Sequence, residues 1–253
     1  DSIAEAVHII ARVRTAASEE AAARGLPTLL ADEGGISPGL ETGRAALEMM
    51  MRLIERAGLR PGEDVQIAID VAATSLQVRE GGYRLAREGR TVDAAAMIAM
   101  QEEWVHEFPV VSIEDGLGEE DWLQWRHLSD RLRSKVQLVG DDLFTTHPER
   151  LARGIRENVA NGVLVKANQN GTLTGTIDII ALAKAAGYAT VVSARSGETE
   201  DAFMSDLAVG TSAGQIKIGS LRTSSTVAKY NQLLRIEESS RAMYAGTAVL
   251  AGR

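Results

Sequence analysis

Short runs of Val, Ile and Leu that are apolar at nearly every position constrain the fold more than any other feature. Amphipathic stretches separate these runs. Strands that are apolar at consecutive rather than alternate positions are typical of a parallel sheet covered on both faces. Strand and helix alternating without a linker predict an α/β fold with right-handed crossovers. The predicted strands are residues 28–32, 65–71, 110–113, 136–139, 162–165, 189–193 and 215–218.

Two of the amphipathic stretches carry clear helix signals. Residues 42–57 place Leu and Met at helical spacing, and residues 91–107 follow a Gly-Arg pair. For the second of these we expect Thr91 to cap the helix and Asp93 to lie in its first turn. Pro148 is expected at the first position of a later helix, where its missing N–H costs nothing.

The length of the chain fits one α/β barrel. Its 253 residues, 45% of them hydrophobic, are enough for a single large core. Seven strands would leave two open edges, whereas eight would close a barrel. We therefore expect a further strand before Asp1. We interpret residues 1–253 as one domain, incomplete at its N-terminus, with residues 239–253 as a frayed tail.

Composition excludes several functional classes. The net charge of -8 argues against a nucleic-acid partner or an anionic membrane surface. The absence of cysteine excludes disulfides and thiolate metal sites. No apolar run reaches the roughly 20 residues that span a bilayer. The acidic excess serves either solubility or a carboxylate cluster that binds a divalent cation, and composition leaves both open.

Charged residues recur where the predicted strands end. A single acidic residue at such a place is usually a helix cap or a solvated loop group, and we interpret Asp115 and Asp142 in that way. Recurrence in consecutive units predicts a shared pocket instead, because the carboxyl ends of barrel strands converge on one face. The candidates for this pocket are Glu33, Asp70, Glu114, Asp141, Lys166, Arg195 and Lys217.

Three of these candidates could bind a metal ion. Asp70, Glu114 and Asp141 follow successive predicted strands, and the chain has no Cys and only four His. Oxygen ligands with open positions suit Mg²⁺, which keeps waters or takes substrate oxygens. Without a cation, clustered carboxylates would repel one another.

The basic candidates supply complementary chemistry. Arg195 can bind a phosphate through two parallel hydrogen bonds. A lysine beside a divalent cation loses its proton more readily, so Lys166 or Lys217 could act as a base toward a carbon-bound proton. Glu33 could protonate a departing hydroxyl group.

These segments resemble the enolases. The resemblance runs from the N-terminus to about Glu238, so it covers nearly the whole chain. Its most specific parts are residues 195–201, Arg-Ser-Gly-Glu-Thr-Glu-Asp, and residues 228–237. Further matching segments are residues 32–35, 69–73, 112–116, 139–143 and 166–173.

The resemblance implies a fold, a reaction and a location. It implies an enolase-type TIM β/α barrel that dehydrates 2-phosphoglycerate reversibly to phosphoenolpyruvate in glycolysis. Mg²⁺ would be the cofactor and a small phosphorylated acid the substrate. A cytoplasmic location and a homodimer or higher oligomer are also implied.

The resemblance further implies a role for each matching residue. Asp70, Glu114 and Asp141 match the metal ligands. Lys166 matches the base that takes the C2 proton, and Glu33 matches the acid that assists loss of the C3 hydroxyl. Residues that match substrate-binding positions are Arg195 and Ser196, for phosphate, and Lys217, for the carboxylate.

The chain departs from the family pattern in three places. The N-terminal α+β domain and the first barrel strand of the family are missing, so we expect this chain alone to be a poor catalyst. Ala194 stands where the family motif has histidine, and residues 222–224 read Arg-Thr-Ser where the family has Ala-Arg-Ser or Ser-Arg-Ser. Two alternatives therefore stay open. One is a divergent enzyme acting on a related phosphorylated or phosphonate substrate, similar to carboxyphosphonoenolpyruvate synthase, and the other is a non-catalytic relative.

Overall fold

The computed structural model describes residues 2–240 and 242–250. Within them the chain forms two compact units. The first unit comprises Asp1–Val65 and Val192–Thr247, and the second comprises Gln66–Val191 and Ala248–Arg253.

A parallel sheet forms the centre of the second unit. Strand β1 pairs in parallel with β4, β4 with β5, and β5 with β6, and β7 follows β6 in the sheet order. Val139, Leu164 and Val191, from three different strands, form one buried cluster. The strands are β1 (Ile67–Asp70), β4 (Val110–Glu114), β5 (Gln137–Gly140), β6 (Gly162–Val165) and β7 (Ala189–Ser193).

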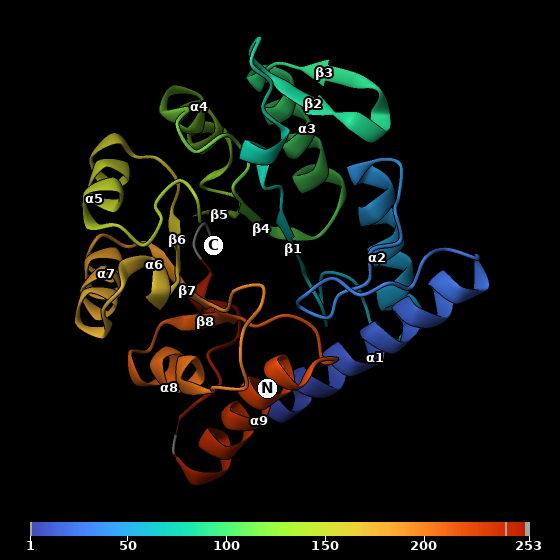
Figure 1. The fold of residues 1–253 in the computed structure, drawn as a ribbon, viewed down its shortest axis with the longest axis vertical. Helices are drawn as coiled ribbons and strands as arrows, with labels where there is room; N and C mark the ends of the chain where they lie inside the picture. The colour runs from blue at the N-terminus through green and yellow to red at the C-terminus, as the bar shows by residue number, and fades with distance from the viewer. Residues whose placement is uncertain (1, 241, 251–253) are drawn as a thin grey trace. The chain divides into compact units, whose positions relative to one another are not determined.

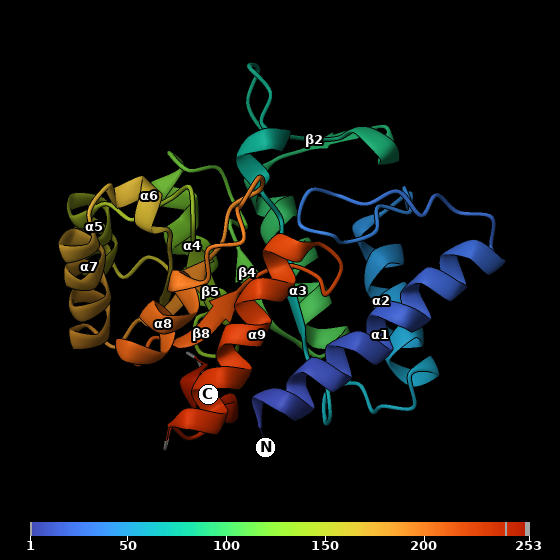
Figure 2. The ribbon, with the colours of Figure 1, turned by 60° about the horizontal axis from the view of Figure 1, so that its bottom comes forward.

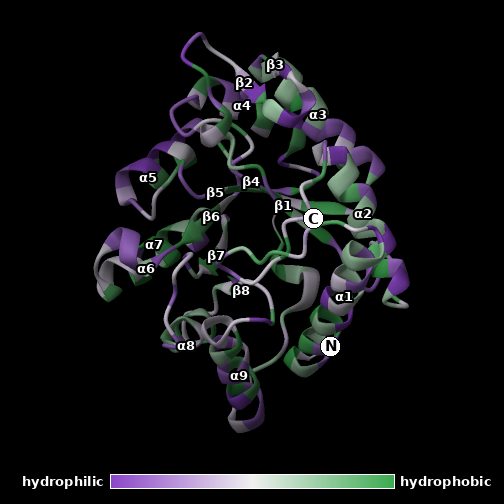
Figure 3. Cartoon of the chain, turned by 45° about the vertical axis from the view of Figure 1, so that its right-hand side comes forward, coloured by the Kyte–Doolittle hydropathy of each residue, from purple (hydrophilic) through white to green (hydrophobic). Residues whose placement is uncertain are grey.

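Helices alternate with these strands along the chain, which confirms the predicted α/β class. Figure 1 shows α3, α4, α5 and α7 on the outer side of β4, β5 and β6. Helix α5 buries Leu151 and Gly154, and Figure 3 shows hydrophilic residues on its opposite face. The helices of this unit are α3 (Ala94–Glu107), α4 (Trp122–Leu132), α5 (Pro148–Glu157), α6 (Ala167–Asn170) and α7 (Leu173–Ala185).

Between β1 and α3 the chain forms an antiparallel ribbon of two short strands. Strands β2 (Tyr83–Leu85) and β3 (Arg90–Val92) pair outside the parallel sheet (Figure 2). The short 3-10 helices η1 (Ala73–Leu76) and η2 (Ala86–Glu88) flank β2.

The predicted N-cap of α3 was wrong by two residues. Thr91 lies in β3, and Asp93 is the N-cap, whose carboxylate accepts the N–H of Ala96 at 2.8 Å. Pairing in the ribbon keeps the backbone extended up to Val92, so the helix cannot begin earlier. Pro148 begins α5 as predicted.

The first unit contains most of the remaining helices. Helices α1 (Ile3–Ala23) and α2 (Gly43–Arg56) lie side by side in Figures 1 and 2 and pack through Ala16, Met49 and Leu53. Near the C-terminus follow α8 (Phe203–Gly210), β8 (Gly214–Lys217) and α9 (Ser224–Ser239). The last two residues of β7 belong to this unit, and β8 is the neighbour of β7 in the sheet order.

The two ends of the first unit are joined by hydrogen bonds. The carboxylate of Glu237 in α9 accepts the N–H of Ile3 at 2.6 Å and that of Ala4 at 3.2 Å. An anion stabilises the N-terminus of a helix because the first N–H groups have no partner within the helix. Beyond α9 lies the short 3-10 helix η3 (Gly246–Val249), and fraying of the tail stays a prediction.

The first predicted strand, residues 28–32, is not a strand in the described structure. Leu30 and Ile36 form a single antiparallel bridge, and Glu33 lies in the turn between them. Gly34 adopts φ 81°, and Pro27 and Pro38 flank the segment. Proline lacks an N–H and glycine favours the left-handed turn, so neither supports a long run of strand pairing.

Among the described residues, none of the helices combines the length and the apolar character that crossing a bilayer requires.

Candidate active site

Two predicted carboxylates lie on neighbouring strands of the second unit. Asp70 ends β1 and Glu114 ends β4, and the parallel register makes them direct partners. Glu114 is buried, with 7% exposure, whereas Asp70 is exposed and accepts the N–H of Ala72 at 3.1 Å. The sheet register itself therefore sets these two carboxylates beside each other.

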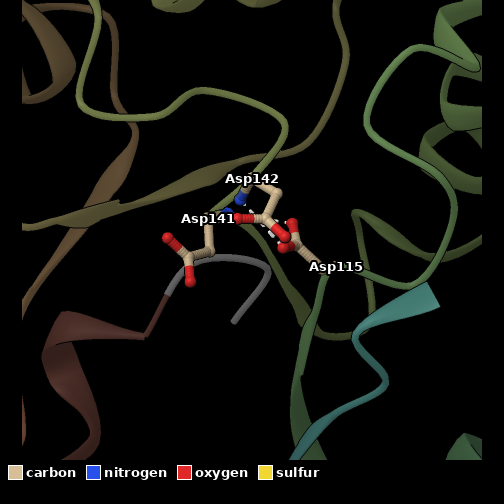
Figure 4. Close-up of side chains that lie close together, drawn as sticks. All are labelled: Asp115, Asp141 and Asp142. Carbon is tan, nitrogen blue, oxygen red and sulfur yellow. Dashed lines mark hydrogen bonds between the residues drawn. The ribbon is translucent and has the colours of Figure 1, made fainter. Parts of the chain in front are cut away.

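A second group of carboxylates follows β4 and β5. One oxygen each from Asp115, Asp141 and Asp142 lies within 4.8 Å of the others (Figure 4). Asp115 is buried, with 4% exposure, and adopts φ 42°. Its two oxygens accept the N–H groups of Asp141 at 2.9 Å and Asp142 at 2.8 Å. Asp115 thus fixes the backbone that carries Asp141.

Burial dominates the electrostatics of Asp115. It raises the pKa of this carboxyl to about 7, and the negative charges of Asp141 and Asp142 act in the same direction. The two backbone N–H groups oppose the shift by stabilising the carboxylate. A proton or a cation at this cluster would relieve the repulsion.

The donor set of this cluster fits a hard cation. Each of its three side chains offers a carboxylate oxygen, which Mg²⁺ prefers over softer ligands. Asp141 is common to this cluster and to the metal set predicted from the sequence. The cluster could therefore hold a divalent metal ion.

The predicted base lies next to one of these carboxylates. Lys166 follows β6, and its ammonium nitrogen lies 2.5 Å from Oδ2 of Asp141. Gln169 donates to the other oxygen of Asp141 at 3.3 Å. Thr146 accepts the backbone N–H of Lys166 at 2.9 Å. The side chain of Lys166 is only 12% exposed, so water has limited access to it.

The predicted acid lies in the first unit. Ser196 donates a hydrogen bond to the carboxylate of Glu33 at 3.3 Å, and Ser220 donates its N–H to the carbonyl of Glu33 at 2.8 Å. Gly219 has φ 105°, and a Cβ atom there would lie 2.8 Å from the carbonyl oxygen of Glu33. Glycine is therefore required for this close approach.

Open pockets of this unit surround Glu33. The larger one has a volume of about 570 Å³ and is lined by Glu33, Ser196 and Ser220, among others. A smaller one of about 30 Å³ is lined by Glu33, Arg195 and Lys229, among others. Polar groups thus converge on the turn that carries Glu33.

The two remaining predicted residues lie at the ends of β7 and β8. Arg195 is exposed and follows Ala194, which is buried with 5% exposure. The carbonyl of Lys217 accepts the N–H of Ala194 at 2.9 Å, and the Lys217 residue is half-buried. Backbone pairing therefore places the start of the Arg195 loop beside β8.

The structure brings the predicted residues together in pairs within each unit. Asp70 lies beside Glu114, Lys166 pairs with Asp141, and Ser196 bonds Glu33. The interpretation of Asp115 as a cap or a solvated group was wrong, because it is buried and holds two backbone N–H groups. The Glu-Asp and Asp-Asp doublets at two consecutive strand ends were the available signal.

Residues 1–252 match the family model described as enolase, C-terminal TIM barrel domain. The chain belongs to the enolase family. The match covers nearly the whole chain, and it agrees with the alternating strands and helices of the structure. The predicted fold class, an enolase-type TIM β/α barrel, is confirmed.

Membership of the enolase family places the chain among enzymes and gives the carboxylate cluster a context. The role assigned to each residue, and the treatment of residues 1–253 as one domain, stay predictions. Asp115 and Asp142 are additions to the candidate site that only the structure supplied.

Proposed function

We propose that this protein catalyses the Mg²⁺-dependent, reversible dehydration of 2-phosphoglycerate to phosphoenolpyruvate. The observation that carries the proposal is the contact between Lys166 and Asp141 at the ends of two neighbouring strands. A candidate base thereby lies beside a candidate metal ligand. This arrangement suits removal of a proton from the carbon next to the substrate carboxylate, because a bound cation can stabilise the negative charge that forms. The family match supports the same assignment.

Asp70, Glu114 and Asp141 would hold the cation. Glu114 and Asp141 are buried, and Asp115 orients the backbone of Asp141. Bound Mg²⁺ would supply positive charge toward the substrate carboxylate, on which negative charge grows during deprotonation.

The chain's own groups would move the protons. In its neutral form, the amine of Lys166 would take the proton from C2, and the electron pair of that C–H bond would become the new C2–C3 double bond. The C3–O bond breaks, and Glu33 gives its proton to the hydroxyl group, which leaves as water. Arg195 and Ser196 would bind the phosphate, and Lys217 the carboxylate.

The direct test follows phosphoenolpyruvate absorbance with 2-phosphoglycerate and Mg²⁺. Because this chain alone is expected to be a poor catalyst, we expect slow turnover that requires the metal and is lost when Asp141 is replaced by Asn. Asp178, an acidic residue of α7, provides a matched control as Asp178→Asn. Absence of turnover by a folded protein that binds Mg²⁺ would remove the proposal.

Ala194 favours a second candidate function. It is buried at the end of β7, where the family motif carries a histidine. A smaller side chain there suits a different leaving group, as in an enzyme acting on a related phosphorylated or phosphonate substrate. Ala194→His separates the two candidates. Gain of 2-phosphoglycerate turnover by this variant, with none in the unmodified protein, would favour the second.

Homodimer or higher oligomer formation is part of the same proposal. Sedimentation at several protein concentrations tests it. A monomer at every concentration would contradict it.

A further inference from the structure

One lysine of the first unit is buried although the proposed reaction does not use it. Lys229 lies in α9 with 1% exposure, on the same face as buried Thr226 and Leu233. Lysine is among the residues least often fully buried unless it is paired, because removing an ammonium group from water is costly.

The ammonium group of Lys229 is satisfied mainly by one loop. It donates to the carbonyl of Thr199 at 2.8 Å and to the carbonyl of Ser225 at 3.0 Å. Its nitrogen lies 3.4 Å from Oε2 of Glu198. Thr199 and Glu198 both belong to the loop between β7 and α8, whereas Ser225 is one turn away in α9.

Glu198 connects Lys229 to the start of the loop. Its other oxygen, Oε1, accepts the backbone N–H of Arg195 at 3.2 Å, and its own N–H bonds the carbonyl of Arg195 at 3.3 Å. The carboxylate therefore bridges Lys229 and the backbone of Arg195. Gly197, with φ 77°, forms the tight bend that makes this return possible.

The exposure of this loop shows why an anchor is needed. Arg195, Ser196 and Gly197 are exposed, and Glu198 retains 29% side-chain exposure. Exposed loops with few apolar contacts open easily. Charge-assisted bonds to a buried group replace the packing that the loop lacks.

We infer that Lys229 is a positioning residue for an anion-binding loop formed by residues 195–200. It acts through the carboxylate of Glu198 and the carbonyl of Thr199, which hold the backbone from which Arg195 and Ser196 extend. The ligand class is a phosphate monoester dianion. The inference rests on the proposed function, in which these two residues bind the substrate phosphate.

The test compares Lys229→Met with Lys135→Met. Methionine has similar length and no charge, and Lys135 is exposed, so the second variant controls for the same chemical change. Binding of inorganic phosphate is measured by calorimetry. Loss of a charge-assisted bond predicts that Lys229→Met weakens binding about ten- to hundredfold. With 2-phosphoglycerate, KM should rise by a similar factor while kcat changes much less.

Hydrogen exchange gives a readout that does not depend on turnover. We expect the amides of residues 195–200 to exchange faster in Lys229→Met and to be unchanged in Lys135→Met. A merely structural role would instead speed exchange along α8 and α9 as much as in the loop. Unchanged loop exchange and phosphate affinity in a folded Lys229→Met would overturn the inference.

If Lys229→Met does not fold, Glu198→Gln tests the same link between Lys229 and the loop. It removes the charge that links Lys229 to Arg195 from a partly exposed position. The expected changes have the same direction as in Lys229→Met, and the double variant should be no worse than Lys229→Met. No effect of Glu198→Gln would count against the inference. Missing turnover in the unmodified protein with normal phosphate binding would refute the proposed reaction only.

Discussion

The two units hold their candidate site residues in different ways. In the second unit, buried Glu114 ends β4 and is placed by strand pairing, and buried Asp141 follows β5, where the carboxylate of Asp115 accepts its N–H. In the first unit, Arg195 and Ser196 are exposed on a loop, and Glu33 lies in a turn. Backbone hydrogen bonds from Ser220 and Glu198 hold those segments.

Substitutions at strand ends and on loops should therefore change different properties of the protein. A side chain at a strand end is placed by the sheet, so its replacement removes mainly its own charge or proton. A side chain on a loop depends on partners elsewhere in the sequence, so substituting one of those partners can displace it. Substitutions at the strand ends of the second unit should act on chemistry, and those in the loop of Arg195 and Ser196 on affinity.

The largest effect is expected at the base. Lys166→Met should lower kcat for 2-phosphoglycerate by about 10²–10⁴-fold, because general-base contributions have this size. The KM should change far less, because the phosphate contacts are assigned to the first unit. Steady-state kinetics beside Lys135→Met measures this. If Lys166→Met kept more than a tenth of kcat, the base would be misassigned.

The core of the second unit should show the next largest effect. Leu138 in β5 is fully buried, so Leu138→Ala should reduce the free energy of unfolding by about 2–5 kcal/mol through lost burial and a cavity. Leu29 in the first unit is 77% exposed, so Leu29→Ala should change stability by less than about 0.5 kcal/mol. Urea denaturation compares the two. Equal losses would show that exposure does not distinguish these segments.

The raised pKa of Asp115 predicts a pH dependence of stability in metal-free buffer. The folded carboxyl titrates near 7, whereas an unfolded aspartate titrates near ~4. The native state therefore binds this proton more tightly than the unfolded state does. The stabilisation that protonated Asp115 gives the native state is fully present below the lower, unfolded-state pKa. As the pH rises from about 4 to about 7, the free energy of unfolding should fall by on the order of 3 kcal/mol.

Asp115→Asn should flatten this profile. Chemical denaturation at a series of pH values, with a chelator present, provides the measurement. Asp178→Asn serves again as a control that leaves the slope unchanged. A wild-type slope retained in Asp115→Asn would assign the titration to another group.

The smallest effects should be the same in both units. Thr42 caps α2 by accepting the N–H of Ala45 at 3.0 Å, and Asp93 caps α3 in the second unit. Thr42→Ala and Asp93→Ala should each cost about 1 kcal/mol in thermal or urea unfolding. A much larger cost in one unit would show that local helix ends, and not only the site residues, differ between the units.

Strand positions in the second unit could be predicted closely from the sequence. The predicted residues 162–165 and 189–193 coincide with β6 and β7, and the other parallel strands are displaced by only a few residues at either end. Buried parallel strands leave a strong signal because almost every position must be apolar. Asp70, Glu114, Asp141 and Lys166 were found in the same way, as charged residues that end such runs.

The irregular segments could not be predicted as well. The turn carrying Glu33 and the β2–β3 ribbon depend on backbone hydrogen bonds between residues that no periodicity marks. Asp115 was misinterpreted because its hydrogen-bond partners are backbone N–H groups. Nearly every residue has such a group, so the sequence does not mark which ones it will meet. The burial of Lys229 depends on two carbonyls and a carboxylate that fold back onto α9. Such contacts become visible only in three dimensions.

The close approach at Gly219 limits which positions around Glu33 can be substituted. The segment that carries Glu33, the proposed acid, is held there by the hydrogen bond from the Ser220 N–H to the Glu33 carbonyl, with no space for even one methyl group at position 219. Residues 29–32 could therefore be randomised in a library while Glu33 keeps its place. Position 219 could not be varied in such a library. Gly219→Ala would add a methyl group against the carbonyl of Glu33 and would therefore shift this proposed proton donor.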